Sequence, residues 1–216
     1  MPETPVRRMT QCQKPSGLLG RIVLWRMNAS HSKVTDWGLR HVAISPTATV
    51  LDVGCGGGRT INKLAAMAAR GRVYGVDFSE RSVDATRRLN VRFVSIGRVH
   101  VSQASVAALP FRNGSFDIVT AIETHFWWPE LPANLREVRR VLKPSGRLAI
   151  IAEVYRGANS TTSRVAAHQA AQVGMTLLTV DEHRDRLVEA GFDDVQIDTV
   201  DDHGWICALA TKPSDV

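Results

Sequence analysis

A glycine-rich loop is the first part of this sequence whose residue types could do chemistry. It reads VLDVGCGGGRT over residues 50–60, and Asp52 stands two positions before the first glycine. Glycines let a ligand approach the backbone closely, and the free N–H groups of a helix that starts after such a loop favour polar or anionic groups. The loop therefore predicts a site for a nucleotide-like ligand.

Two common nucleotide loops do not fit this spacing. A phosphate-binding P-loop needs Lys followed by Ser or Thr after its last glycine, where this chain has Arg59 and Thr60. The dinucleotide fingerprint GxGxxG needs a third glycine at position 59, which excludes an NAD-dependent oxidoreductase. The carboxylate of Asp52 would also repel a pyrophosphate. It favours a positively charged ligand without phosphate groups, and S-adenosylmethionine, with its ammonium and sulfonium, is such a ligand.

A second candidate site is the run ETHFWWP over residues 123–129, which combines an acid, an imidazole and three aromatic rings. The unperturbed pKa of histidine suits a general base near neutral pH, so His125 can orient or deprotonate a nucleophile. An acid beside aromatic rings can also bind a cationic amine through cation–π contacts. Alternatively, the aromatic rings pack under the next helix and His125 forms a local hydrogen bond.

Alternating strands and helices must hold these two segments in place. Strands are predicted at 48–54, 72–78, 98–104, 115–123 and 147–155, with two more within 193–213 around a turn at Asp202–Gly204. Helices are predicted at 59–71, 80–97, 130–146, 160–178 and 181–192, after two short helices within 17–43. Apolar strands that alternate with helices indicate a parallel sheet covered on both faces. We therefore expect an α/β protein with a Rossmann-like, doubly wound, mostly parallel seven-stranded sheet and a C-terminal antiparallel hairpin.

The composition is typical of a globular protein. The chain has 216 residues, of which 44% are hydrophobic and 22% charged, and its formal net charge is +6. We expect a flexible tail at 1–16, a helical cap at 17–45 and the main domain at 46–216. No membrane span, secretory signal or zinc pattern is predicted, and three distant cysteines favour a reducing cytoplasm. The positive charge leaves a nucleic-acid partner open, although a solvated surface also accounts for it.

Four segments, in order, resemble the motifs of the class I S-adenosylmethionine-dependent methyltransferases. VLDVGCGGG resembles the first motif, VYGVDFS the second, ALPFRNGSFDIVTAIE the stretch into the fourth strand, and LKPSGRLAI the entry to the fifth. The resemblance covers residues 46–155 closely and the C-terminal hairpin loosely. It implies S-adenosylmethionine as the methyl donor and S-adenosylhomocysteine as the product.

The resemblance also implies which residues bind the donor. Asp77, at the tip of the second strand, would accept hydrogen bonds from both ribose hydroxyls. Phe78 would lie against the adenine, and Asp52 would face the methionine ammonium directly or through water. Many relatives carry Gly-Asp-Ala where this chain has Ala104–Val106, so Ser105 would replace the missing acid as acceptor for the adenine amino group. The other residues expected at the donor are Gly54, Cys55, Gly56, Gly58, Ser79, Ala104, Val106 and Glu123.

The acceptor site is less defined. Open α/β sheets bind ligands beyond the carboxyl ends of their strands, where the segment after the fourth strand would lie. The two N-terminal helices either fold over the donor as a lid or pack against the sheet. Catalytic candidates are His125 and Glu123, although transfer from a sulfonium needs a base only if the acceptor is protonated. The residues expected at the acceptor are Met27, His31, His125, Trp127, Trp128 and Tyr155.

We therefore expect a methyltransferase that acts on an O, N or S atom of a small molecule. An RNA or DNA methyltransferase is the second hypothesis, which the basic charge favours. Against it, AIETHFWWP lacks the Asn/Asp-Pro-Pro-Tyr/Phe signature of many base-amino methylating enzymes. A non-catalytic, cofactor-binding partner subunit is the third hypothesis, and the intact first motif argues against it. No metal site is predicted, and the oligomeric state stays open.

Overall fold

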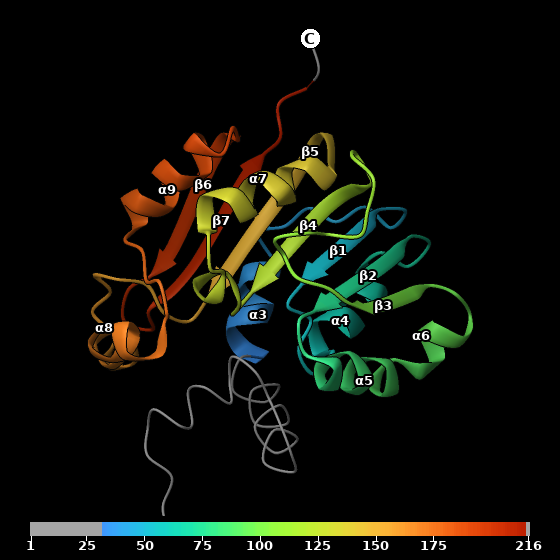
Figure 1. The fold of residues 1–216 in the computed structure, drawn as a ribbon, viewed down its shortest axis with the longest axis horizontal. Coiled ribbons are helices and arrows are strands. Elements are labelled where there is room, and N and C mark those ends of the chain that lie inside the picture. The colour runs from blue at the N-terminus through green and yellow to red at the C-terminus, as the bar shows by residue number, and fades with distance from the viewer. Residues whose placement is uncertain (1–31, 215–216) are drawn as a thin grey trace, which may run out of the picture.

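A mixed sheet of seven strands organises residues 32–214, which are the residues described by the structure, a computed structural model. The strands are β1 Thr49–Val53, β2 Arg72–Asp77, β3 Val99–Gln103, β4 Phe116–Ile122, β5 Leu142–Ala152, β6 Asp193–Val200 and β7 Trp205–Thr211. They lie in the order β3-β2-β1-β4-β5-β7-β6 (Figure 1). β1 to β5 run parallel, whereas β7 pairs antiparallel with both β5 and β6. The predicted Rossmann-like sheet with a C-terminal antiparallel hairpin is confirmed.

Helices cover both faces of this sheet (Figure 1). They are α3 Ser32–Leu39, α4 Arg59–Met67, α5 Glu80–Leu89, α6 Val91–Ser95, the 3-10 turn η1 His125–Trp127, α7 Leu131–Val141, α8 Thr161–Val173 and α9 Val180–Glu189. α3, α4 and α5 contact one face of the sheet, and α7 and α9 contact the other. No helix in this described part of the chain is long and apolar enough to cross a bilayer.

The carboxyl ends of β1, β2 and β4 lie side by side. Asp52 of β1 pairs with Gly75 of β2 on one side and with Thr120 of β4 on the other. Parallel strands in this register place their ends at one edge of the sheet, where open α/β sheets bind ligands. The loops that follow the three strands therefore share one site.

The predicted helix over 80–97 is in fact two helices, α5 and α6. Asn90 lies between them, is almost fully buried, and its side-chain amide donates to the carbonyls of Gly58 (2.9 Å) and Thr86 (3.0 Å). The side chain thus donates to a carbonyl in the last turn of α5 and connects that end of the helix to the glycine-rich loop. A local hydrogen bond of this kind competes with the helix and ends it.

The predicted helix over 130–146 ends earlier, at Val141. Leu142 already pairs with Phe116 of β4, so β5 begins there instead of at the expected residue 147. Pro144 explains the early end, because it has no N–H to donate and its ring disfavours a helical conformation in the residue before it.

α3 is the part of the predicted helical cap that the structure describes, and it packs on the sheet. The Cys207 thiol donates to the carbonyl of Gly38 at 3.7 Å, and the rings of Trp37 and Trp205 lie 5.8 Å apart. A Cβ on Gly38 would lie 2.5 Å from Ile151 Cγ2, so only glycine permits this close approach. The tail and the first of the two predicted N-terminal helices lie outside the described residues, and the division at residue 45 stays a prediction.

Candidate active site

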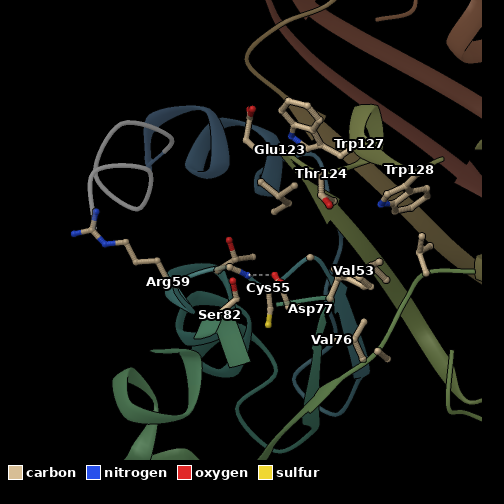
Figure 2. A pocket seen from close by; sticks show the side chains of 18 of the residues that line it. Val53, Cys55, Arg59, Val76, Asp77, Ser82, Glu123, Thr124, Trp127 and Trp128 are labelled. Atoms are coloured by element: carbon tan, nitrogen blue, oxygen red, sulfur yellow. Dashed lines mark hydrogen bonds between the residues drawn. The ribbon is translucent and has the colours of Figure 1, made fainter. Parts of the chain in front are cut away.

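A cavity of about 360 Å³ opens beyond the carboxyl ends of β1, β2 and β4 (Figure 2). A volume of this order is typical of small-molecule sites. The structure brings most of the predicted site residues together on its walls. These are Gly54, Cys55, Gly56, Asp77, Phe78, Ala104, Ser105, Val106, Glu123, Trp127 and Trp128.

Other wall residues were not assigned from the sequence motifs. They are Ser32, Thr35, Val53, Gly57, Arg59, Thr60, Lys63, Val76, Ser82, Ile122, Thr124 and Pro129. Thr60 and Lys63 stand three positions apart in the first turns of α4, so they share one face of that helix. Their three-residue spacing directly after the loop indicates that both side chains lie near it, but neither residue belongs to the motifs quoted above.

The glycine-rich loop is held against the end of β2. The N–H groups of Gly54 and Cys55 both donate to the carbonyl of Val76, at 2.8 and 3.0 Å. Gly54 has φ 84°, in the left-handed region, and Gly56 has φ 51°. A Cβ on Gly56 would meet only Gly54 O, at 3.9 Å, so this glycine leaves the cavity floor bare. The loop therefore offers a ligand backbone in place of side chains, as predicted.

Asp77 links the loop to the end of β2. Its Oδ2 accepts from Gly56 N–H and its Oδ1 from Ser79 N–H, each at 2.9 Å. Burial raises the pKa of this carboxyl, and the two backbone N–H groups oppose the rise. The carboxylate is thus fixed in direction and borders the cavity, where its oxygens can accept further hydrogen bonds from a diol.

The predicted adenine side of the cavity combines one exposed ring with backbone. Phe78 is 59% exposed although it follows a buried strand, and it lines the cavity together with Ala104, Ser105 and Val106. The N–H of Ala104 donates to the carbonyl of Asp77 at 3.1 Å, which places this segment beside the tip of β2. A large ring exposed at a cavity mouth is what stacking on a base requires.

Asp52, which was expected to face the methionine ammonium directly or through water, does not border the cavity. It is 1% exposed, is not among the residues that line the cavity, and accepts a hydrogen bond from Thr120 Oγ1 at 2.7 Å. Side chains alternate along a strand, so its neighbour Val53 reaches the cavity and Asp52 does not. Burial raises the pKa of Asp52 to about 7, against the hydrogen bond from Thr120. Direct contact with a ligand ammonium does not fit this placement.

Gly58 and Ser79 also lie off the cavity wall, contrary to the prediction. Gly58 has φ 84°, and a Cβ there would lie 2.7 Å from Thr86 Cα, so this glycine serves the close packing of α4 on α5. The side chain of Ser79 is buried and caps α5 by accepting from Ser82 N–H at 3.4 Å. Both residues support the loop and the carboxylate of Asp77 from behind.

Cys55 lines the cavity as a packing residue. It is 4% exposed, and its sulfur accepts a hydrogen bond from Thr86 Oγ1 at 3.6 Å. Burial, and then the charges of Asp77 and Asp52, raise the pKa of its thiol well above the ordinary value. A thiol that stays protonated is a poor nucleophile, so the environment of Cys55 suits packing rather than catalysis.

Glu123 takes a backbone conformation that is rare outside glycine. Its φ is 56°, its N–H donates to Ile151 O at 2.9 Å, and its Oε1 accepts from the N–H of Glu153. Such strain persists where the surrounding structure imposes it, and it is common at functional sites. The turn directs this carboxyl to the cavity wall at the end of β4.

His125 and Tyr155 do not reach the cavity, so their predicted acceptor contacts are corrected. His125 is 2% exposed, and its Nε2 lies 3.0 Å from Nε2 of His183. Burial and then His183 hold the pKa of His125 well below its ordinary value. Tyr155 is 3% exposed, and its hydroxyl donates to the carboxylate of Asp201. His125 does form a hydrogen bond within the fold, but its partner lies 58 positions away, so this bond is not the local one that was the alternative.

Trp127 and Trp128 stand across the cavity from the loop. Figure 2 shows both rings with Glu123 and Thr124 on one side, and Asp77 and Cys55 on the other. Met27 and His31, which were also expected at the acceptor, lie outside the described residues. The cavity thus has a polar end built on backbone and carboxylate and an aromatic end built on two indoles.

These residues fit an adenosine-type ligand with an attached acceptor space. A bare glycine floor, a fixed carboxylate and an exposed ring match a ribose and a base. Within residues 32–214 no group of three or more His, Cys, Asp or Glu side chains is arranged to hold a metal ion.

Comparison with known proteins identifies methyltransferases as relatives of this chain. The Methyltransferase domain family matches residues 51–150. An O-methyltransferase of Pyrenophora dematioidea is 30% identical over 71% of this chain and 57% of its own length. The methyltransferase GfsG of Streptomyces halstedii is 30% identical over 84% of this chain and 66% of its own length. The chain thus spans only about half to two thirds of the length of these relatives.

A solved structure supports the fold. Phosphoethanolamine N-methyltransferase 2 of Haemonchus contortus, in complex with phosphomonomethylethanolamine and S-adenosylhomocysteine, superposes with a TM-score of 0.68 at 17% identity. The match covers 88% of this chain and 53% of that one.

Proposed function

Because this chain belongs to the class I S-adenosylmethionine-dependent methyltransferases, we propose that it moves the donor's methyl group to an oxygen, nitrogen or sulfur atom of a small-molecule acceptor. One observation carries the proposal. A single cavity joins the polar end around Asp77 to the aromatic end formed by Trp127 and Trp128. Two ligands can therefore meet inside it.

The residues at the polar end are those that would hold the donor. Asp77 would accept from the ribose hydroxyls, Phe78 would stack on the adenine, and Ser105 would accept from the adenine amino group. The glycine floor would lie under the methionine portion. When bound, the donor would supply a methyl group on a sulfonium, from which a neutral thioether departs as a good leaving group.

The protein's own contribution is then to position the acceptor and to exclude water. Holding a nucleophile in line with the bond that breaks supplies much of the rate of such a transfer. Trp127, Trp128 and Pro129 offer the flat and apolar surface on which a small acceptor can be held. Glu123 is the carboxyl on that wall, and we assign it the orientation of the acceptor's nucleophilic atom or the removal of its proton.

Oxygen is the acceptor atom that we place first, because the O-methyltransferase of Pyrenophora dematioidea is among the relatives. Cys55 and Cys207 are both buried and form no disulfide, which supports a reducing compartment such as the cytoplasm. The net charge of +6 keeps RNA in the set of acceptors to be screened.

A thermal-shift comparison tests the donor site. S-adenosylmethionine and S-adenosylhomocysteine should raise the melting temperature, since a ligand at about 100 times its Kd stabilises by about 2.7 kcal/mol. NAD should not. Asp77→Ala should abolish the shift, whereas Asp185→Ala, at an exposed position of α9, should keep it. The donor assignment is refuted if neither compound stabilises the wild-type chain.

A methyl-transfer screen tests the acceptor. Pools of phenols, enols, amines and thiols, and RNA in parallel, are incubated with S-adenosylmethionine, and product masses are measured. Formation of a methylated small molecule supports the proposal, and methylation of RNA alone contradicts it.

A further inference from the structure

A pair of buried histidines, His125 of η1 and His183 of α9, lies directly behind the aromatic end of the cavity. The two Nε2 atoms are 3.0 Å apart, and both side chains are 2% exposed. η1 carries Trp127, and Trp128 follows it, so the pair is attached to both cavity indoles through one turn of backbone. We refer to His125 and His183 below as the histidine pair.

The hydrogen bonds around the pair fix where its protons are. His183 Nδ1 lies 2.7 Å from the carbonyl of Thr179, which can only accept, so Nδ1 carries the proton. In a neutral ring, Nε2 of His183 is then an acceptor, and Nε2–H of His125 must donate to it. His125 Nδ1 is left without a proton, buried, and with no hydrogen-bond partner among the described residues.

A second long-range hydrogen bond also holds the turn that carries the two indoles. The N–H of Thr176 donates to the carbonyl of Phe126 at 2.8 Å. Thr179 caps α9 through a reciprocal pair of hydrogen bonds with Glu182, which holds the carbonyl that orients His183. The segment before α9 and α9 itself thus hold η1 at two points, the carbonyl of Phe126 and the ring of His125.

We propose that the histidine pair positions Trp127 and Trp128, and that adding a proton to the pair releases this wall of the cavity. A proton on Nε2 of His183 would set two N–H groups against each other at the same contact, and the bond would be lost. A proton on Nδ1 of His125 would create a buried cation with no described acceptor. Either outcome favours a state in which the turn moves away from α9.

The charges around the pair set the pH range. Burial, and then His183, lower the pKa of His125, while burial lowers the pKa of His183 against the opposing effects of the Thr179 carbonyl and the Glu182 carboxylate. Glu182 is itself paired with Arg156. Since both folded pKa values lie below the ordinary 6.5, the wall is stable above that pH. Its stability is lost as the pH falls below it.

The inference relies on the proposed function only in treating this cavity as the methyl-transfer site, so its test needs a readout without ligand. The chain has five tryptophans, and a fluorotryptophan-labelled chain gives one fluorine NMR signal for each. Trp127→Phe and Trp128→Phe variants assign the two cavity signals. We expect both signals to shift or broaden as the pH falls from about 8 to about 4.5, a range that extends well below the ordinary histidine pKa because both folded pKa values are lowered.

Three variants separate positioning from mere folding. His183→Gln keeps an acceptor for His125 but cannot be protonated, so the two signals should stay at their high-pH positions throughout. His183→Leu fills the space without an acceptor, so they should be displaced even at high pH. His168→Gln, on the exposed side of α8, should behave as wild type. A wild-type acid response in His183→Gln, or unmoved signals in His183→Leu, would overturn the proposal.

Binding of S-adenosylhomocysteine, measured by calorimetry over the same pH range, gives the functional counterpart. The wild-type Kd should rise at least several-fold on acidification and that of His183→Gln should not. If the wild-type chain binds no S-adenosylhomocysteine at any pH while its two signals respond to acid, the proposed function fails and the role of the histidine pair stands.

Discussion

Gly54 and Thr124 touch across the floor of the cavity, at a distance that leaves no room for a side chain on the glycine. A Cβ on Gly54 would lie 2.3 Å from Thr124 Oγ1, and the φ of 84° is itself unfavourable for any other residue. The contact joins the loop after β1 to the turn after β4, so the polar and aromatic ends of the cavity are packed against each other.

Gly54→Ala should therefore remove binding of S-adenosylhomocysteine. Gly157→Ala is the matched control, because Gly157 also has positive φ (99°) but a Cβ there meets nothing within 4 Å. Both variants should lose about 1 kcal/mol of stability from the backbone conformation. Only Gly54→Ala should lose binding by calorimetry, and equal binding by the two variants would contradict the steric argument.

Asp52→Asn should stabilise the ligand-free chain at alkaline pH. The pKa of Asp52 is raised to about 7 from 3.8, so between these values the folded chain binds more protons than the unfolded one. The free energy of unfolding therefore falls as the pH rises through this window. Above about pH 7 the free energy of unfolding of the variant should exceed that of the wild-type chain by roughly a few kcal/mol. At about pH 4 the two free energies should be equal.

Asp117→Asn is the control of opposite sign for that experiment. Although partial burial opposes it, hydrogen bonds from Lys143 and Thr49 hold the pKa of Asp117 below its ordinary value. Its carboxylate is favoured in the folded chain, so this variant should be less stable than wild type at neutral pH. Urea unfolding at several pH values measures both effects as the difference in unfolding free energy between each variant and wild type. If this difference changes with pH in the same direction for Asp52→Asn and Asp117→Asn, the opposite pKa shifts of the two carboxyls are disproved.

Glu123→Gly should separate stability from activity. Glycine adopts the φ of 56° without strain, so relief of that strain should add about 1 kcal/mol to the free energy of unfolding, against the loss of the hydrogen bond from Glu153 N–H to the Glu123 carboxylate. It should lose most methyl transfer to the acceptor found by screening, because the carboxyl is gone. Asp194→Gly, at an exposed position with φ 48°, should show the stability gain without the activity loss.

Lys63→Met should weaken binding of S-adenosylhomocysteine through α3. Lys63 Nζ donates to Ser32 O (3.4 Å) and Oγ (3.3 Å) and pairs with Asp36, so it holds the start of α3 at the cavity. We expect a Kd about two- to tenfold higher, and a smaller change for Asp36→Asn, because exposed ion pairs contribute less than about 1 kcal/mol. An equal effect of the two variants would assign the whole contribution to the ion pair.

The residues whose placement at the cavity follows from the sequence are those fixed by their position at the end of a strand. Asp77 ends β2 and Phe78 follows it, and the direction of the strand alone puts both at the cavity. Asp52 stands one residue before Val53, and the alternation of side chains along β1 reverses its direction. A sequence motif shows which residue type is present, but the alternation of side chains along the strand sets the face to which that side chain points.

The predictions that failed depend on contacts between distant segments. His125 is paired with a residue of α9, and Tyr155 with one in the β6–β7 turn, 46 positions away. Asn90 ends α5 because it reaches the loop before α4. None of these partners can be inferred from the spacing of residues around the side chain itself.

The packing of α3 on β7 has a consequence for synthesis on the ribosome. β7 lies between β5 and β6, and Cys207 and Trp205 are the residues that Gly38 and Trp37 contact. The first described helix therefore cannot complete its packing until the last described strand has left the exit tunnel. Such a chain waits with apolar surface exposed, a state in which chaperones bind nascent proteins.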